Sequence, residues 1–197
     1  YLDCETLNLC LNYSFNLPWQ IAMLEVVDDK VISSDDLLLK WKTHLKISPE
    51  AAVITRYDQN KVDMKGVDPK SAFDIIEGKI ESCDYLIGHN FLGFDLYLIY
   101  ELFKLFDKDP RGLVNKVLDT NCFAKAIKLG LTPAVGEPLI NFQYRMQGIR
   151  QKGLKTRLEI IAKEYEIEFD YTTLHNAEND LILNKLVWEK QRFQLDI

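Results

Sequence analysis

Hydrophobic residues are spaced in two ways along this chain, and the two spacings predict strands and helices. In the first half, apolar or alternating runs at residues 2–5, 19–27 and 31–41 predict strands, with a tight turn at 28–30 between the last two. These strands are expected to open the sheet in antiparallel order. Later, short apolar runs at 85–87 and 117–119 predict further strands. Helical spacing covers residues 68–82, 95–106, 122–129, 154–165 and 176–192. Alternation of strand and helix predicts an α/β fold.

Length and composition narrow the class of protein. The chain has 197 residues, 47% of them apolar and 27% charged, which predicts one soluble domain over residues 1–197. No apolar run approaches the roughly 20 residues that span a bilayer, and no secretory signal is visible. Because the chain begins inside an expected strand, residues are expected upstream of it. The four cysteines lack zinc-site spacing, and reduced thiols in a cytoplasmic protein are expected.

The first unusual acidic residues are Asp3 and Glu5. In a strand, residues two apart point to the same face, so both carboxylates project together while Leu2 and Cys4 point the other way. Two neighbouring carboxylates repel each other unless a proton or a cation lies between them. The alternative is an exposed strand end with solvated acids. This pair by itself leaves the two interpretations open.

Asp95 and Asp180 are placed on helical stripes that otherwise predict burial. Asp95 begins a stripe that continues three, four, seven and eight residues later with apolar residues, and Asp180 begins a similar stripe that is interrupted by Asn184. A lone carboxylate on a buried face is costly. The alternative for Asp95 is an acid favoured by the helix dipole. If the acids converge, hard cations such as Mg²⁺ or Mn²⁺ suit their oxygen ligands.

His175 lies five residues before Asp180, which on a continuous helix would turn the two side chains well apart. We therefore expect His175 in the loop before that helix, where it can reach the same site. The alternative is a structural or surface histidine.

These residues resemble the motifs of the DnaQ-like 3′→5′ exonucleases of the DEDDh type, over nearly the whole chain. The similar segments are Asp3-Cys4-Glu5-Thr6 (D-x-E-T), Asn90 to Asp95 (an Asn followed by Phe-Asp), and His175 to Asp180 (H-x4-D), with Leu118-Asp119-Thr120 and Gly153-Leu154-Lys155 as further familiar features. Each motif is short, and their order and spacing together make the resemblance specific.

The resemblance implies an RNase H-like fold, with a mixed five-stranded sheet flanked by helices on both sides. It also implies two divalent ions, Mg²⁺ or Mn²⁺, that both contact Asp3. Glu5 and Asp180 would complete the site of the ion that binds the attacking water, and Asp95 would support the second ion. His175 would be the general base. Thr6 and Leu7 would border the terminal nucleotide.

Basic and aromatic residues alternate in a segment that looks longer than in compact members of the family. Residues 130–152 are a candidate family-variable insertion. Between residues 138 and 158 every charged residue is basic. Arg145, Arg150 and Lys152, together with Phe142 and Tyr144 in the same segment, suit a single strand whose phosphates and bases they would contact. The alternative is a solvated connector whose aromatic residues pack on the domain. His89 and Asn90 either line the cleft or form a structural turn.

The function that follows is a metal-dependent 3′→5′ exonuclease that releases nucleoside monophosphates from single-stranded 3′ ends, with DNA preferred to RNA. Such an enzyme would serve processing or proofreading, with a polymerase or other replication protein as partner, in the cytoplasm of the cell or of a phage host. The alternatives are a 3′→5′ exoribonuclease and a non-catalytic nucleic-acid-binding module. A net charge of −6 argues against binding by bulk electrostatics, although bound metal ions supply positive charge locally. The His-x4-Asp spacing disfavours an RNase H-like endonuclease.

Overall fold

The computed structural model describes residues 1–11, 16–42 and 46–195. Its strands are β1 (Leu2–Thr6), β2 (Pro18–Val27), β3 (Lys30–Leu38), β4 (Leu86–Gly88) and β5 (Val117–Asp119). Its α-helices are α1 (Pro49–Ile54), α2 (Gln59–Lys65), α3 (Pro69–Ser82), α4 (Asp95–Leu105), α5 (Thr120–Leu129), α6 (Leu139–Gly148), α7 (Leu158–Glu164) and α8 (Ala177–Gln191). Short 3-10 helices are η1 (Phe91–Gly93), η2 (Leu113–Lys116) and η3 (Tyr171–Thr173). Within the described ranges, no helix combines the length and apolarity needed to cross a membrane.

Strands β1, β2 and β3 form an antiparallel sheet, as the sequence predicts. Asp28 and Asp29 connect β2 to β3 with φ angles of 48° and 65°. Two positive φ angles in a two-residue connection are those of a type I′ turn, whose twist suits an antiparallel hairpin. The predicted turn is confirmed. Strand β3 ends at Leu38 and not at residue 41, because the chain turns away there and Leu39 forms a parallel bridge with Val67.

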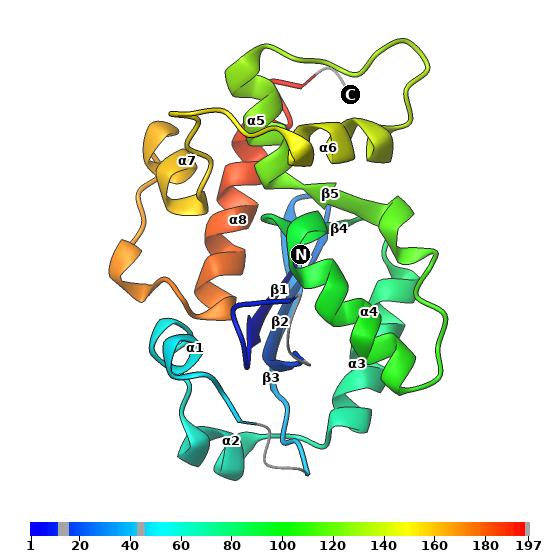
Figure 1. Cartoon of the computed structure of the whole chain (residues 1–197), viewed down its shortest axis with the longest axis vertical. Coiled ribbons are helices and arrows are strands. Elements are labelled where there is room, and N and C mark those ends of the chain that lie inside the picture. The colour runs from blue at the N-terminus through cyan, green and yellow to red at the C-terminus, as the bar shows by residue number, and fades with distance from the viewer. Residues whose placement is uncertain (12–15, 43–45, 196–197) are drawn as a thin grey trace.

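Helices cover both faces of β2, which confirms this part of the predicted fold. Ile21 and Met23 lie in the main core cluster with residues of α3 and α4. Ala22 and Leu24, which alternate with them, pack against residues of α8. Figure 1 shows α3 and α4 on one side of the strands and α8 on the other. Both faces of β2 are buried from Pro18 to Leu24, which explains why residues 21–24 are all apolar and do not alternate.

The five strands do not form the single sheet that was predicted. In the described residues the strands pair as a three-stranded antiparallel sheet and a separate two-stranded parallel sheet of β4 and β5, with Gly88 opposite Asp119. Strand β4 lies beside β1, but no ladder joins the two. The physical reason is length: β4 and β5 have three residues each and offer few groups for pairing.

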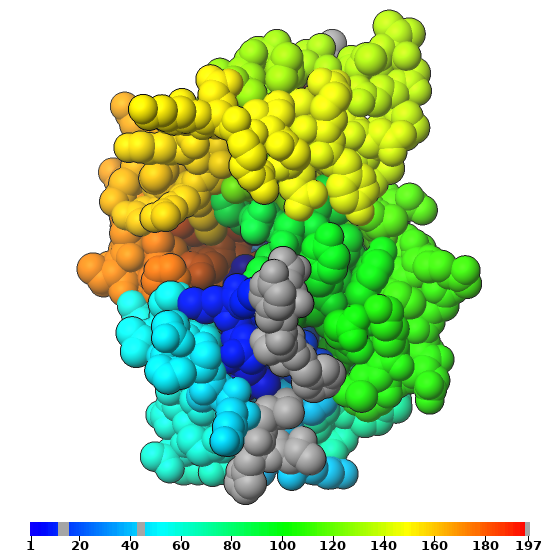
Figure 2. All heavy atoms as spheres, in the orientation of Figure 1, coloured from blue at the N-terminus to red at the C-terminus, as the bar shows by residue number. Residues whose placement is uncertain are grey.

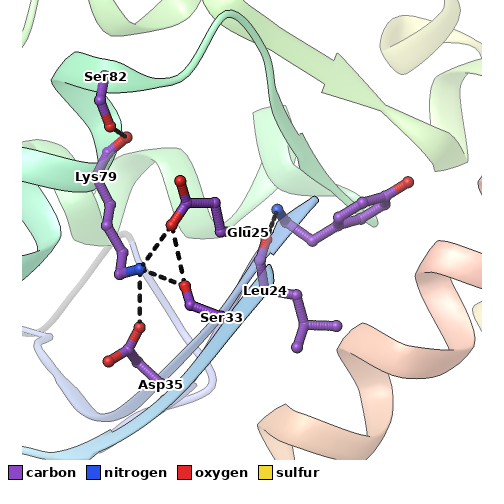
Figure 3. A network of polar contacts seen from close by, with 7 residues as sticks. Leu24, Glu25, Ser33, Asp35, Lys79 and Ser82 are labelled. Carbon is purple, nitrogen blue, oxygen red and sulfur yellow. Dashed lines mark hydrogen bonds and ion pairs between the residues drawn. The ribbon is translucent and has the colours of Figure 1, made fainter. Parts of the chain in front are cut away.

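One lysine of helix α3 adds polar contacts to the β2–β3 hairpin (Figure 3). The Nζ atom of Lys79 lies 3.1 Å from Glu25 Oε2, 2.7 Å from Ser33 Oγ and 3.1 Å from Asp35 Oδ2. These partners match the three donors of an ammonium group. The contacts fix α3 against the hairpin, on the sheet side away from α8.

Three helices were not predicted, and a fourth begins later than predicted. Helices α1 and α2 are short and start at capping residues, Ser48 and Asp58. Helix α6 interrupts residues 130–152, and its apolar stripe is broken by the buried Gln143. Helix α7 begins at Leu158 and not at residue 154, because the chain before it is extended and the Thr156 carbonyl accepts hydrogen bonds from other segments.

The buried Gln143 explains why a helix packs against β5. Its Oε1 accepts the Asp119 N–H at 2.7 Å, and its Nε2 donates to the Val117 carbonyl at 2.9 Å. The side-chain amide therefore takes the place of a neighbouring strand and covers this edge of β5.

We expect Gln143→Met to lower stability markedly, because it leaves one buried N–H and one buried carbonyl of β5 without these partners. Each such group costs about 1–3 kcal/mol. The melting temperature measured by circular dichroism tests this, with Gln151→Met as an exposed control. A Gln143→Met protein as stable as the control would show that the amide does not hold α6 on β5.

Candidate functional site

Strand β1 supplies two carboxylates to one side of the sheet. Leu2 and Cys4 lie in the main core cluster, so Asp3 and Glu5 point to the opposite face, where α8 packs. This alternation is the one predicted from the sequence. Glu5 is buried and Asp3 is half-buried. The exposed strand end, with both acids fully solvated, is therefore not what the structure has.

Asp180 of α8 meets this pair. One carboxylate oxygen from each of Asp3, Glu5 and Asp180 lies within 4.8 Å of the other two. Helix α8 places Asp180 there because its N-terminal turn packs on β1 and β2 through Ala177 and Leu181. The three residues come from segments about 175 positions apart in sequence. The convergence is therefore a product of the tertiary fold.

Asp95 reaches the same region from the other side of β1. It is the first residue of α4, it is buried, and its Oδ1 accepts the backbone N–H of Cys4 at 3.0 Å. Cys4 lies between Asp3 and Glu5, so Asp95 is held at the backbone of the strand that carries them. Its carboxylate lies outside the three-oxygen group, yet near enough for its charge to act on both strand acids.

Burial raises the pKa of every acid in the group, and the charges of neighbouring acids raise the pKa of Asp3 and Glu5 further. Burial raises the pKa of Glu5 to about 8, with the charges of Asp180 and Asp95 adding to it. Burial also raises the pKa of Asp95 to about 7 and that of Asp180 to about 6. The pKa of Asp3 is well above its ordinary value, first through burial and then through the three neighbouring acids. Four acids that resist ionisation in one place favour a bound cation.

His175 lies beside this group, in the loop that precedes α8, as predicted. Its φ angle is 64°, in the left-handed region, and the helix N-cap is the next residue, Asn176. The imidazole is exposed. Burial raises the pKa of Asp180, whereas the charge and the backbone N–H of His175 both lower it. A sharp turn immediately before the helix thus keeps the imidazole near Asp180.

The site opens into a cleft of about 710 Å³. Figure 2 shows the surface hollowed where the yellow segment near residue 150, the orange segment near residue 175 and the blue first strand meet. The residues that line it come from β1, from the segments after β4 and β5, from the segment before α7, and from the loop and first turn of α8. They include Asp3, His89, Asn90, Asn121, Lys125, Arg150, Arg157, His175 and Asp180.

His89 lines this cleft, but both its ring nitrogens are already engaged. Nε2 lies 2.9 Å from the Thr156 carbonyl, and Nδ1 lies 2.9 Å from the Thr120 hydroxyl. A carbonyl only accepts, so Nε2 must carry the proton. Burial lowers the pKa of His89 to about 4. The ring therefore joins the loop before α7 to the start of α5 and forms part of the cleft wall.

Asn90 and the segment up to Asp95 are held by a buried carboxylate. Asp119 accepts the N–H groups of Asn90 and Leu92 at 3.0 Å each, and those of Asn121 at 2.9 Å and Cys122 at 3.3 Å. One side chain thus caps α5 and fixes η1, which leads directly into Asp95. Sequence analysis noted Asp119 only as a familiar feature and assigned it no role. Its signal was a carboxylate at the end of an apolar run.

Of the other residues predicted to bind substrate, one lines the cleft and four lie outside its lining. Arg150 lines the cleft. Arg145 does not: it is bound to Glu137 by hydrogen bonds of 3.1 and 2.7 Å, and Lys152 is exposed outside the lining residues. Thr6 is buried and donates to the Asn8 carbonyl, while Leu7 lines a separate hollow of about 430 Å³.

The segment 130–152 therefore combines features of the two alternatives, a connector and a segment that binds a single strand. Phe142 is fully buried in the core, as a connector would have it. Tyr144 stays largely exposed and Arg150 faces the cleft, as a binding segment would have it.

Sequence analysis missed Lys125 and Arg157, which also line the cleft. Lys125 follows Cys122 by three residues on the buried face of α5 and is only 9% exposed. A charge on a buried stripe was the signal that singled out Asp95, and the same reasoning finds Lys125. Arg157 lies just before α7 and carries no comparable local signal.

The chemistry of the acid group suits a divalent ion. All the donors are carboxylate oxygens, three of them are already within a distance that one ion can bridge, and their repulsion is relieved by positive charge. Hard ions such as Mg²⁺ and Mn²⁺ prefer this donor set, whereas zinc more often takes nitrogen or sulfur ligands.

The fold and the site define an α/β domain with an acid-lined cleft. No protein-family model matches the chain, and no curated protein matches its sequence. Solved structures do match, and several of them are of E. coli exonuclease I. E. coli exonuclease I with a dT13 oligonucleotide shares 18% identity at a TM-score of 0.74, over 98% of this chain and 40% of that chain. The zinc-bound E. coli ExoI–ssDNA complex shares 20% identity at a TM-score of 0.74, over 98% and 41%.

The product-bound structure of exonuclease I gives a similar result, with 18% identity and a TM-score of 0.72 over 95% of this chain and 41% of that chain. The α/β exonuclease fold expected from the resemblance is therefore confirmed, whereas the expected single sheet of five strands is not formed by the described residues. The chain spans about two fifths of the length of the exonuclease I chains that it matches.

Proposed function

We propose that residues 1–197 form one exonuclease domain that releases nucleoside monophosphates from single-stranded 3′ ends in a metal-dependent reaction. The observation that carries this proposal is the group of Asp3, Glu5 and Asp180, one carboxylate oxygen from each lying within 4.8 Å of the others, beside a cleft of about 710 Å³. Structures of E. coli exonuclease I hold dA16 and dT13 oligonucleotides. This supports single-stranded DNA as the preferred substrate.

The acids would hold two divalent ions, Mg²⁺ or Mn²⁺. Asp3 would contact both, Glu5 and Asp180 would complete the first site, and Asp95 would support the second. When bound, the ions would supply a water of lowered pKa and stabilise charge on the attacking and leaving oxygens. The chain's own contribution is to keep four carboxylates in place, which it does with β1, α4 and α8.

His175 would accept the proton of the attacking water. It is exposed at the mouth of the acid group, so an incoming water can reach its ring. It is not needed as an ion ligand, because the acids provide the oxygen donors. A neutral imidazole is a suitable base near neutral pH.

The remaining predicted residues would hold the strand. Thr6 and Leu7 would border the terminal nucleotide, and His89 and Asn90 would shape the cleft wall. Of the basic residues, Arg150 should contribute more than Arg145, because Glu137 already neutralises Arg145; Lys152 would act from the rim. The polymerase or replication partner and the cytoplasmic location stay predictions.

A non-catalytic binding module is less consistent with these observations. Burying four acids that repel one another costs stability, and a module that only binds has no use for that cost. All five residues of the proposed mechanism are present. An exoribonuclease differs only in the sugar it accepts, and a direct assay distinguishes it.

We expect 5′-labelled single-stranded DNA to be shortened stepwise from its 3′ end when Mg²⁺ or Mn²⁺ is present. EDTA should abolish the reaction, because the acids cannot stabilise the developing charge without ions. Matched RNA should be degraded more slowly. Gel electrophoresis of the labelled products follows all of this in one experiment.

Circular single-stranded DNA is the control, since it has no 3′ end and should stay intact. Linearised circles would identify an endonuclease. Faster loss of RNA would identify the exoribonuclease. Intact linear substrates with every ion would reject the proposed function.

A further inference from the structure

Two cations meet at one carbonyl oxygen inside the cleft. Lys125 Nζ lies 3.1 Å from the Gln147 carbonyl oxygen, and Arg150 Nη1 lies 2.8 Å from the same atom. The two charges are therefore within about 6 Å of each other. Lys125 comes from α5 and Arg150 from the segment after α6, so the tertiary fold brings them together.

A neutral carbonyl is a weak partner for two positive charges. The oxygen belongs to the last turn of α6, where a cation is a common cap. One donor would satisfy that role, and here there are two. Lys125 is also nine-tenths buried, and burial lowers its pKa, with the charge of Arg150 acting in the same direction.

Two cations nearby in the structure are neutralised by acids, whereas Lys125 and Arg150 form no such pair among the described residues. Lys128, one turn further along α5, pairs with Glu164 at 2.7 Å, and Arg145 pairs with Glu137 at 2.7 Å. Across residues 1–11, 16–42 and 46–195, neither Lys125 nor Arg150 forms a salt bridge. A desolvated cation with no counter-charge is costly, and an anion from solution removes that cost.

The pair faces the space that a strand would occupy. Lys125 and Arg150 line the same cleft as Asp3 and Asp180, the acids proposed to act on the scissile bond. A phosphate at the acids needs bound metal ions to offset its charge, whereas a phosphate at the cations needs none. The acids and the cations thus suit different phosphates of one strand.

We propose that Lys125 and Arg150 form a binding site for one internucleotide phosphate of the strand, separate from the scissile phosphate. This inference rests on the proposed exonuclease function and extends it. Lys125 and Arg150 donate charge-assisted hydrogen bonds to the phosphate oxygens, and the guanidinium matches them with two parallel donors. The site holds the part of the strand that remains after each nucleotide is released.

The test compares two substrates that differ in this phosphate. The p-nitrophenyl ester of thymidine 5′-monophosphate contains only the bond to be cleaved, whereas an oligothymidylate also has upstream phosphates. We expect Lys125→Met to raise KM for the oligothymidylate about tenfold, with kcat little changed. Turnover of the p-nitrophenyl ester should stay at the wild-type value. Lys125→Arg should restore most of the oligothymidylate KM.

Lys128→Met is the matched control, since it removes a lysine from the same helix outside the cleft lining. Arg150→Gln should reproduce the Lys125→Met result. If Lys125→Met changes neither substrate, or slows both equally, the phosphate site is wrong while the exonuclease proposal stands.

Binding tests the phosphate site independently of cleavage. Fluorescence anisotropy with a 5′-fluorescein-labelled oligothymidylate is measured in an Asp3→Asn background, with and without Lys125→Met. We expect affinity to fall about tenfold and the slope of log K against log salt to fall by about 0.7, the value for one phosphate contact on a single strand. If the wild type cleaves neither substrate, the proposed function fails and this arm still decides the site. An unchanged affinity and slope, or no binding at all, would overturn it.

Discussion

Replacing Asp3 by asparagine is expected to abolish cleavage and, at the same time, to stabilise the metal-free protein. Asp3 is the proposed ligand of both ions and has three acidic neighbours acting on its pKa. Losing its charge weakens ion binding and removes several kcal/mol of transition-state stabilisation, a loss of about 10³-fold or more in rate. The same change relieves the repulsion between the carboxylates, which in the wild-type protein is offset only when ions are bound.

The stability gain should depend on pH in a defined direction. Glu5 shows why: its ordinary pKa of 4.5 becomes about 8 in the folded chain. At a pH below 4.5 both folded and unfolded chains hold the proton, and folding carries no penalty. Between 4.5 and about 8 the unfolded chain ionises first, so metal-free stability declines as pH rises. The pKa of Asp3 is raised as well, so Asp3 adds to the same decline, and asparagine at position 3 removes that contribution and should flatten the decline.

Thermal unfolding in EDTA across this pH range measures the effect. We expect Asp3→Asn to be more stable than wild type at the alkaline end by at least about 1 kcal/mol, or about 2–4 °C in melting temperature for a domain of this size. Calorimetric titration with Mn²⁺ should show weakened binding. Asp84→Asn is the control, since Asp84 is exposed. A variant less stable than wild type in EDTA would mean that Asp3 supports the fold through contacts other than ions.

Replacing His175 by alanine is expected to remove the general base and leave the ion site intact. General-base catalysis contributes about 10²–10⁴-fold, so kcat should fall by an amount in that range. The limb of the pH–rate profile produced by a titrating imidazole should disappear. Mn²⁺ titration should give near wild-type affinity, which separates this variant from Asp3→Asn.

Backbone strain at His175 requires a second variant. Its φ of 64° is unfavourable for alanine, whereas asparagine adopts it readily. His175→Asn should therefore lose the same rate while keeping the loop conformation, and its melting temperature should match wild type because the side chain is exposed. Wild-type rates in both variants across the pH range would make the histidine structural and the proposed mechanism wrong.

Which parts of the site were predictable follows from how local each signal is. Four consecutive residues of β1 show the alternation, and from it Asp3 and Glu5 were correctly predicted to lie on one face. The loop position of His175 followed from its separation from Asp180, and the structure has it there. Helix α6 was missed because its buried Gln143 hides an apolar stripe, and only contact with β5 shows why an amide belongs there.

The roles of the polar residues depend on partners far away in the sequence. Arg145 and Arg150 cannot be told apart from the sequence of their basic segment. In the structure Glu137 neutralises Arg145, whereas Arg150 lines the cleft. His89 looked like a cleft residue, and it is one, yet its ring is engaged with Thr120 and Thr156. No pattern within a few residues contains these contacts.

The sequence by itself determined the order of most strands and helices, the face of each acid and the α/β class, because burial periodicity is a property of neighbouring residues. Tertiary structure alone decided the pairing of five strands into two sheets, the meeting of Asp180 with β1, and the convergence of Lys125 and Arg150 on one carbonyl. Those features arise from packing between segments that are tens to more than a hundred residues apart, where spacing along the chain carries no information about distance.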